Sequence, residues 1–443
     1  MSSVDLSPYL KALEKVDPLR VYGKVVEITG ILIKATGIRS SVGEACKIYS
    51  DSQNDSQSAK PIDSEVVGFK DGKVLLMATG DIAWIKPGSR VYSMGSKVSI
   101  KVGRQLIGRV IDESGSPIDG KGPIMGENYP IFSIPPNPLT KERIREPIDL
   151  GIGAINGLLT IGKGQRIGIM AGAGVGKSVL LGMMAKYTKA DVNVIALVGE
   201  RGREVREFIE RDLGPEGMTR SVVVVSTSEQ SAVAKVKGAF VATAISEYFR
   251  SKQLDVLLFM DSLTRVAMAQ REIGLAIGEP PASKGYTPSV FALLPKLLER
   301  AGTAKGKGSV TGIYTVLVEG DDLTDPVADA ATSILDGHIV LSRALAMENH
   351  YPAIDVLRSI SRVMPDIIDR NHLSTAGKFI ETLATYRRFE DMINLGAYKE
   401  GSNPKVDYAI RMDTLLNNYL KQGITESRDM ATSLDSMYKL FQA

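Results

Sequence analysis

The sequence feature that most constrains this chain is a glycine-rich turn, Ala171–Ser178, between an apolar strand-like run and a helical run, Val179–Ala185. Glycines let the backbone wrap closely, so successive N–H groups point at an oxyanion, and the helix N-terminus adds positive potential. Lys177 can reach terminal phosphates, and the Ser178 hydroxyl can ligate Mg²⁺. We therefore predict a phosphate cradle. Its predicted nucleotide-binding residues are Gly172, Ala173, Gly174, Val175, Gly176, Lys177, Ser178 and Val179.

Strand-like and helical runs alternate around this turn, from Gly164 to about Ser342. The strand-like runs are almost continuously apolar, which suits a parallel sheet buried on both faces. The pattern predicts a doubly wound α/β fold. The predicted strands are Arg166–Met170, Val192–Val198, Val222–Ser226, Val256–Met260, Thr311–Val318 and His338–Leu341.

The segments that flank this core have other patterns. Short Val- and Ile-rich runs between turns predict a small β-barrel over residues 21–95, followed by the α/β core at 96–366. Residues 367–443 carry apolar stripes at helical spacing and predict a small helical domain. Residues 1–20 predict an amphipathic helix, which either packs on its own domain or docks on a partner.

Three local predictions complete the organisation. Val21–Lys34 is predicted to be one strand, and Lys70–Lys73 a two-residue hairpin turn, because Asp-Gly tolerates positive φ. Val110–Gly120 has the punctuation of a turn within a connecting region, Ser99–Pro147. Ser50–Lys60 is polar and is predicted to be a loop.

Composition narrows the classes of function. The net charge of +3 is too small to indicate nucleic-acid binding. Cys46 is the only cysteine, so no intrachain disulfide can form and a reducing cytosol fits. The three histidines have no metal-ligand spacing. No signal peptide is expected, and no apolar run approaches the ~20 residues of a membrane-spanning helix.

Two carboxylates follow strands that should end at the same edge as the turn. Asp261 follows Val256–Met260, where a carboxylate can support Mg²⁺ or cap the next helix. Glu200 ends another strand and either polarises an attacking water or is a solvated charge in the run Glu200–Arg211. Arg201 can contact a γ-phosphate. Because ligands of open α/β sheets lie beyond the carboxyl ends of strands, we predict a site for Mg²⁺-dependent ATP hydrolysis.

Longer motifs resemble the rotary-ATPase superfamily. They are Gly199–Val205, Met260–Arg265 and Pro352–Arg362, the last with the family pattern of Pro, Asp and two Ser spaced by one. Within the superfamily, the chain most closely resembles the flagellar type III protein export ATPases. That resemblance lies in Asp261–Gly274, Gly278–Ala282 and Gly285–Phe291. It covers essentially the whole chain and implies a RecA-like core. The family also accepts alanine at the position of Ala171, where the strict pattern of such phosphate-binding loops begins with glycine.

The resemblance implies a role for each candidate. Lys177 and Ser178 would bind the phosphates and Mg²⁺, Glu200 would activate water, and Asp261 would support the metal. Tyr351 would stack on adenine, although a core aromatic also fits its position. Arg362 would be an arginine finger in the neighbouring subunit's site, although a surface ion pair also fits its spacing. The active form would then be a homo-oligomeric ring, and the superfamily implies six copies.

The resemblance also implies partners and location. The segment 1–20 would bind a dimeric regulator that keeps the ATPase inactive and tethers it to the export gate. The loop Glu279–Pro288, with the helical tail, would meet a coiled-coil stalk protein in the ring pore. Complexes of export chaperones with their substrates would be further partners, and no specific nucleic acid is expected. The protein would be cytoplasmic and peripherally associated with the export apparatus at the inner membrane.

Other functions share part of this pattern. A catalytic subunit of a rotary ATP synthase would carry an acidic lever loop, which Gly396–Pro404 lacks. A non-catalytic ring subunit would lack Glu200. An RNA translocase would need a basic, aromatic surface, and the barrel segment shows no basic clustering. The ATPase of a virulence type III secretion system shares all the motifs, so this alternative stays open.

Overall fold

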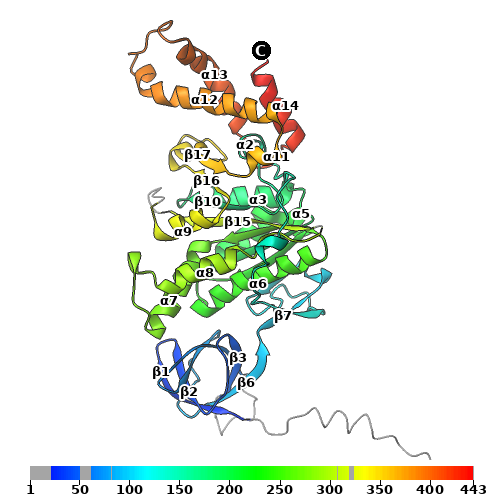
Figure 1. The fold of residues 1–443 in the computed structure, drawn as a ribbon, viewed down its shortest axis with the longest axis vertical. Coiled ribbons are helices and arrows are strands. Elements are labelled where there is room, and N and C mark those ends of the chain that lie inside the picture. The colour runs from blue at the N-terminus through cyan, green and yellow to red at the C-terminus, as the bar shows by residue number, and fades with distance from the viewer. Residues whose placement is uncertain (1–20, 50–60, 81, 307, 319–323, 443) are drawn as a thin grey trace, which may run out of the picture. The chain divides into compact units, whose positions relative to one another are not determined.

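The computed structural model describes residues 21–49, 61–80, 82–306, 308–318 and 324–442 (Figure 1). The chain divides into two compact units, residues 1–98 with 276–278, and residues 99–275 with 279–443. The predicted helix over 1–20 and the predicted loop Ser50–Lys60 lie outside the described residues. The finer division into four domains stays a prediction.

The first unit is a closed barrel of six strands in the order β1-β2-β5-β4-β3-β6, as predicted. The β4–β5 hairpin pairs Lys70 with Lys73, and Asp71 and Gly72 have the positive φ of the predicted turn, 50° and 70°. The single strand predicted over Val21–Lys34 is wrong, because the chain turns at Gly30, with φ 57°, to form the β1–β2 hairpin. The strands are β1 Gly23–Thr29, β2 Leu32–Thr36, β3 Glu44–Tyr49, β4 Ile62–Lys70, β5 Lys73–Ala78 and β6 Arg90–Lys97.

The second unit is built on a nine-stranded sheet in the order β17-β16-β10-β15-β13-β11-β12-β8, with β14 paired to β15. The ladders from β16 to β8 are parallel, whereas β17 and β14 pair antiparallel. The strands are β8 Val110–Asp112, β10 Arg166–Ala171, β11 Val192–Val198, β12 Ser221–Ser226, β13 Asp255–Asp261, β14 Gly302–Thr303, β15 Ser309–Leu317, β16 Gly337–Leu341 and β17 Ile354–Ser361. Outside this sheet β7, Ser99–Val102, pairs with β9, Glu127–Pro130.

Helices cover both faces of this sheet (Figure 1). Alternate residues of β10 and β11, such as Ile169 and Leu197, share one core with Leu180 and Met184 of α3. On the other face α6 packs along β11, β12 and β13. The helices of the core include α3 Lys177–Tyr187, α4 Gly202–Glu207, the π-helix η3 Phe208–Leu213, α5 Gly214–Met218, α6 Ala232–Ser251, α7 Leu263–Ile277, α8 Pro288–Leu298, α9 Pro326–Ile334 and α10 Arg343–Met347.

The C-terminal part is helical, as predicted, with α12 Arg370–Asn394, α13 Pro404–Leu420 and α14 Met430–Leu440. Asn403 caps the N-terminus of α13, since its side chain accepts a 3.0 Å hydrogen bond from the Lys405 N–H. The Tyr419 hydroxyl donates to the carbonyl of Gly153, which ties α13 to the short helix α2, Gly153–Leu158. The predicted fold class is therefore confirmed. Among the described residues, no helix has the length and apolar character needed to cross a membrane.

Two elements of the sheet differ from expectation. Val110–Asp112, predicted as part of a turn, is strand β8 and pairs with β12. The turn follows it, where the Asp112 carboxylate accepts hydrogen bonds of 2.8 Å from the N–H groups of Ser114 and Ser116. Strand β17 was not predicted as a strand, because its sequence mixes polar and apolar residues, as an edge strand allows.

Candidate active site

The glycine-rich turn lies where the central strand β10 ends and α3 begins. Gly174 and Gly176 have φ of 78° and 86°, a left-handed conformation that side chains other than glycine rarely adopt. Val175 is buried, whereas Ala173 and Gly174 are exposed. The turn therefore presents free backbone N–H groups and the positive end of α3 at the carboxyl edge of the sheet.

Three charged side chains meet at this edge. The Lys177 ammonium donates a hydrogen bond to the Asp261 carboxylate and lies 3.6 Å from Glu200 Oε1. Asp261 ends β13, and Glu200 follows β11. All three side chains are at most 15% exposed. The strand order thus brings together the carboxylates that sequence analysis placed at one edge.

Two side chains of this cluster were missed by sequence analysis. Thr315 of β15 donates a 2.7 Å hydrogen bond to Asp261 Oδ1 and is fully buried. Arg265 of α7 lies close to Gly199, and its charge lowers the pKa of Glu200. Thr315 is a polar residue within a largely apolar strand, which is only a weak indication of a role in the site. Arg265 belongs to a motif already noted, four residues after Asp261.

Burial raises the pKa of the Glu200 carboxyl to about 7. Lys177 opposes this increase, whereas the nearby Asp261 charge and a hydrogen bond with Glu204 add to it. A small cavity of about 90 Å³ lies beside Glu200, Ser178 and Asp261, which is more than one water molecule requires. Glu200 is therefore placed and poised to accept a proton from water near neutral pH.

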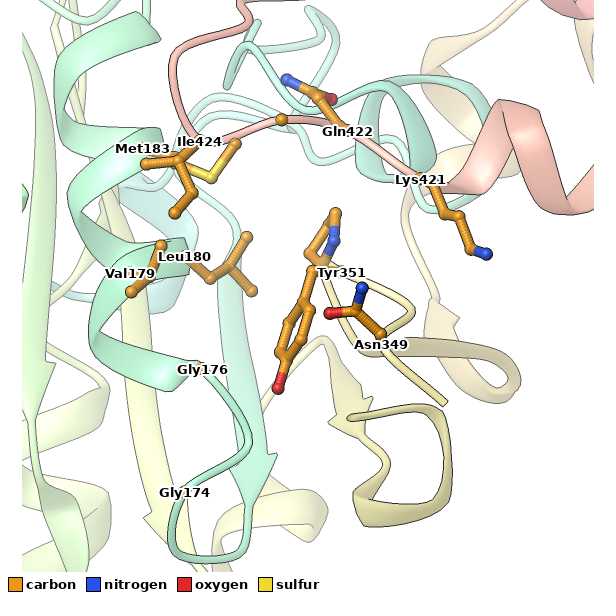
Figure 2. A pocket seen from close by; sticks show the side chains of 12 residues that line it. Gly174, Gly176, Val179, Leu180, Met183, Asn349, Tyr351, Lys421, Gln422 and Ile424 are labelled. Atoms are coloured by element: carbon orange, nitrogen blue, oxygen red, sulfur yellow. The ribbon is translucent and has the colours of Figure 1, made fainter. Parts of the chain in front are cut away.

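A larger cavity of about 580 Å³ lies against the turn and the first turns of α3 (Figure 2). The Tyr351 ring points toward Gly176, where the Cβ of any larger residue would approach Tyr351 Cε1 to 3.3 Å. Apolar side chains of α3 face the ring, and Gln422 donates its N–H to the Tyr351 carbonyl at 2.9 Å. This cavity can take a planar base, with the phosphates leading toward Lys177. It is lined by Gly174, Gly176, Val179, Leu180, Met183, Asn349, Tyr351, Pro352 and Lys421–Ile424.

The two remaining candidates do not join this cluster. The Arg201 side chain is 76% exposed and lies 3.8 Å from Glu204. Arg362 follows β17, whose first residue, Ile354, pairs with Leu341 and whose last, Ser361, pairs with Gly337. Since Leu341 also pairs with Ala171, the start of β17 lies at the edge of the glycine-rich turn. Because β17 bulges, its eight residues lie opposite only the five of β16, and the Arg362 N–H donates to the carbonyl of Asp336, one residue before β16. At roughly 3.3 Å per residue, the Arg362 backbone is therefore about 16 Å farther along, at the opposite edge of the sheet.

The residues present fit a magnesium ion that takes most of its ligands from a nucleotide and water. In the described residues, no group of three or more His, Cys, Asp or Glu side chains could hold a metal. Ser178 lies in the first turn of α3 and lines the same small cavity as Asp261, so the hydroxyl of one and the carboxylate of the other offer the oxygen ligands that Mg²⁺ prefers. Magnesium is usually bound in this way, by few protein groups together with substrate phosphates.

Comparison with known proteins identifies the family. Residues 151–361 match the nucleotide-binding domain of the ATP synthase alpha/beta family, and residues 368–439 match the T3SS EscN ATPase C-terminal domain. The flagellum-specific ATP synthase of Bacillus subtilis is 53% identical over 97% of this chain and 98% of its own. The chain belongs to the ATP synthase alpha/beta family. It is an ATPase of that family and a homologue of the flagellum-specific ATP synthases.

Other members of the family agree over nearly the full length. The flagellum-specific ATP synthase of Pseudomonas aeruginosa is 50% identical over 93% of this chain and 91% of its own. Among solved structures, the assembled ATPase EscN of the enteropathogenic E. coli type III secretion system matches with a TM-score of 0.88 and 42% identity, over 94% of this chain and 99% of that one. EscN in complex with its central stalk EscO matches with a TM-score of 0.86.

The raised pKa of Glu200 predicts how this ATPase depends on pH. A carboxyl with a pKa of about 7 is mostly protonated below that pH, and the protonated form cannot accept a proton. We expect kcat/KM to fall as pH falls below about 7, approaching tenfold per unit. Rates measured from about pH 6 to pH 8, with Mg²⁺ in excess, would test this.

The variant Glu204→Ala distinguishes the titration of the Glu200 carboxyl from titration of the phosphates of ATP. It removes a hydrogen bond that raises the pKa of Glu200, so the midpoint should move to lower pH. A profile that is flat across this range in the wild type, or a midpoint unmoved in Glu204→Ala, would contradict the assignment.

Tyr351 predicts a change in affinity for ATP. Stacking of a base on an aromatic ring contributes about 1–3 kcal/mol, so Tyr351→Ala should raise KM for ATP by roughly 5- to 150-fold. Because the ring lies far from the bond that breaks, kcat should change little. Tyr351→Phe keeps the ring and is the matched control, with a KM near the wild-type value. Steady-state kinetics on both variants decide, and an unchanged KM in Tyr351→Ala would exclude stacking.

Proposed function

We propose that this protein is the Mg²⁺-dependent ATPase of a flagellar type III protein export apparatus, active as a homo-hexameric ring. The cluster of Lys177, Asp261 and Glu200 supports hydrolysis, since it combines a phosphate-binding cation with a carboxyl that is half protonated near pH 7. The observation that carries the ring is the position of Arg362, which is too far from its own glycine-rich turn to act there.

In the proposed reaction the phosphates bind the N–H groups of the turn, and Lys177 exchanges its carboxylate partners for phosphate oxygens. Ser178 and Asp261 would hold Mg²⁺, which would neutralise charge on the phosphates. Glu200 is then free to orient a water in the adjacent cavity and to accept its proton. Arg362 of the neighbouring copy supplies the positive charge that the transition state requires.

The same proposal assigns the partners. A dimeric regulator binds residues 1–20 and tethers the ring to the export gate, and complexes of chaperones with export substrates dock on the assembled ring. A coiled-coil stalk protein enters the pore near Glu279–Pro288 and the helical tail. The complex of EscN with its central stalk EscO supports such a partner. The protein acts in the cytoplasm, at the inner membrane face of the export apparatus.

A genetic experiment tests the flagellar assignment. In the source organism, deletion of the gene should abolish secretion of flagellar hook protein and swimming, and wild type supplied on a plasmid should restore both. Glu200→Gln made at the same level is the matched control and should restore neither. The virulence alternative is favoured by a relative, the type 3 secretion system ATPase of Xanthomonas euvesicatoria, 48% identical over 91% of this chain. It would be supported if the deletion stopped effector secretion and left swimming intact.

A further inference from the structure

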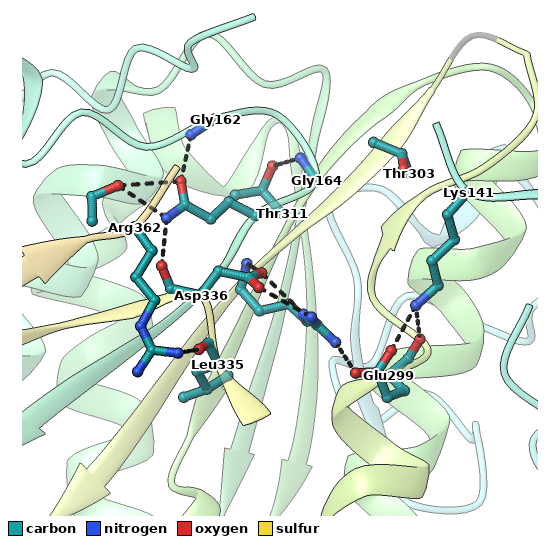
Figure 3. A network of polar contacts seen from close by, with 12 residues as sticks. Lys141, Gly162, Gly164, Glu299, Thr303, Thr311, Leu335, Asp336 and Arg362 are labelled. Carbon is teal, nitrogen blue, oxygen red and sulfur yellow. Dashed lines mark hydrogen bonds and ion pairs between the residues drawn. The ribbon is translucent and has the colours of Figure 1, made fainter. Parts of the chain in front are cut away.

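We propose that Gln165 and Ser361 are positioning residues that fix the backbone from which Arg362 reaches the neighbouring copy. The inference rests on the proposed function, since it presumes that Arg362 acts in the next subunit's site. It concerns a polar network at the amino-terminal ends of β10 and β16, whereas the glycine-rich turn follows the carboxyl end of β10 (Figure 3). No residue of this network touches the nucleotide site of its own chain.

Strand β17 needs external support because it is an irregular edge strand. Its pairing with β16 shifts register between His338 and Val340. At this irregularity the Ser359 hydroxyl donates to the Asp355 carbonyl at 2.6 Å and accepts from the Val340 N–H at 2.9 Å. The Asp355 carboxylate accepts from the N–H of Leu357 at 3.1 Å. Polar residues of the Pro352–Arg362 motif thus fix the bulge, and with it the register of the strand that ends beside Arg362.

Gln165 fixes the end of this strand. It is fully buried, and its amide nitrogen donates to the Ser361 hydroxyl at 3.0 Å and to the Asp336 carbonyl at 3.1 Å. Its amide oxygen accepts from the Gly162 N–H at 2.8 Å. The Ser361 hydroxyl donates onward to the Thr160 carbonyl at 2.8 Å. Because every polar atom of the amide is satisfied, the network is rigid, and loss of one member leaves buried partners unpaired.

Asp336 fixes the backbone of Arg362 itself. The carbonyl that binds Gln165 also accepts from the Arg362 N–H at 3.0 Å. The Asp336 carboxylate pairs with the Arg166 guanidinium through two contacts of 3.1 Å and accepts from the Arg166 N–H at 3.0 Å (Figure 3). Arg166 begins β10, the strand that ends at the glycine-rich turn. The backbone that leads into the Arg362 Cα, from Ser361 to the Arg362 N–H, is therefore held by the central sheet.

The tip of Arg362 is held more loosely than its backbone. The guanidinium reaches the Leu335 and Thr332 carbonyls at 3.4 Å each, which is long for a hydrogen bond. These carbonyls belong to the C-terminal end of α9, where a cation is moderately favoured. The Arg362 guanidinium can therefore exchange these long hydrogen bonds at the end of α9 for contacts with a phosphate bound to the neighbouring copy, while its backbone stays fixed.

The test uses rings mixed from two variants. Ser361→Ala and, independently, Gln165→Met remove the network's hydrogen bonds with little change of volume. Ser333→Ala, an exposed serine of α9, is the matched control. A misplacement of about 1 Å can cost on the order of 10²-fold, so we expect kcat to fall about 10- to 100-fold in the two network variants. The control should keep wild-type kcat, and all three should keep wild-type KM and ring assembly.

Mixing then locates the defect. Rings of Ser361→Ala with Glu200→Gln should regain activity, because the Glu200→Gln copy lends an intact Arg362 to the intact site of its neighbour. Rings of Ser361→Ala with Arg362→Ala should not regain activity, since both lack a working finger. The inference is overturned if Ser361→Ala and Gln165→Met keep wild-type kcat while Arg362→Ala is inactive, or if Glu200→Gln fails to rescue Ser361→Ala. Full activity of Arg362→Ala would instead overturn the proposed function itself.

Discussion

The variant Glu200→Gln is expected to hydrolyse ATP on the order of 10²–10⁴-fold more slowly than wild type while still binding it. Glutamine keeps the shape of the side chain but cannot accept a proton. Binding should persist, because Lys177, the turn and the Tyr351 cavity are unchanged. It should even tighten slightly, since the substitution removes a negative charge 3.6 Å from the Lys177 ammonium. Single-turnover hydrolysis and equilibrium binding of a fluorescent ATP analogue measure the two effects separately.

Glu210→Gln is the matched control for this variant. Glu210 lies in the charged run after Glu200, and its side chain is 62% exposed and pairs with Arg206. Its loss should leave turnover within about twofold, because exposed ion pairs contribute little. If Glu200→Gln behaved like this control, Glu200 would be a solvated charge, the alternative that its sequence context left open.

Arg362→Ala should lower kcat on the order of 10³–10⁵-fold, which is the contribution of arginine fingers in other NTPases. The isolated chain should bind ATP normally, because Arg362 lies at the opposite edge of the sheet from its own nucleotide cavity. Arg370→Ala, which removes an exposed arginine at the start of α12, is the control and should be active. Turnover of pre-assembled rings and ATP binding by the isolated chain together test the claim.

A defect in ATP binding by the isolated Arg362→Ala chain would contradict this account, as would wild-type turnover. The same geometry predicts that wild-type activity per chain rises steeply with protein concentration. A single copy has the phosphate-binding turn, but the arginine that completes the site comes from a second copy.

The core of the fold and half of the site could be predicted from local sequence. Val192–Val198 and Asp255–Asp261 are buried on both faces, so their continuous apolar runs identify them as central parallel strands. Once those strands are placed, Glu200 and Asp261 must lie at one edge with Lys177. This inference needs only strand direction and the rule that ligands bind beyond carboxyl ends.

Features that depend on contacts between distant segments could not be predicted in this way. Strand β8 has only three residues and is stabilised by its pairing with β12, more than a hundred positions away. Thr315 acquires its contact with Asp261 only when β15 lies beside β13. The separation of Arg362 from its own turn follows from the antiparallel direction of β17, which a polar edge strand does not reveal.

The most direct test of the central claim, that each site takes its arginine from the next copy, is ATP turnover by rings mixed from Glu200→Gln and Arg362→Ala chains. Each variant alone should be nearly inactive. In an equal mixture, about a quarter of the interfaces place an intact site next to an intact finger, because a head-to-tail ring takes the two from successive copies. The account predicts that activity returns on mixing. A mixture no more active than the two variants measured separately would contradict it.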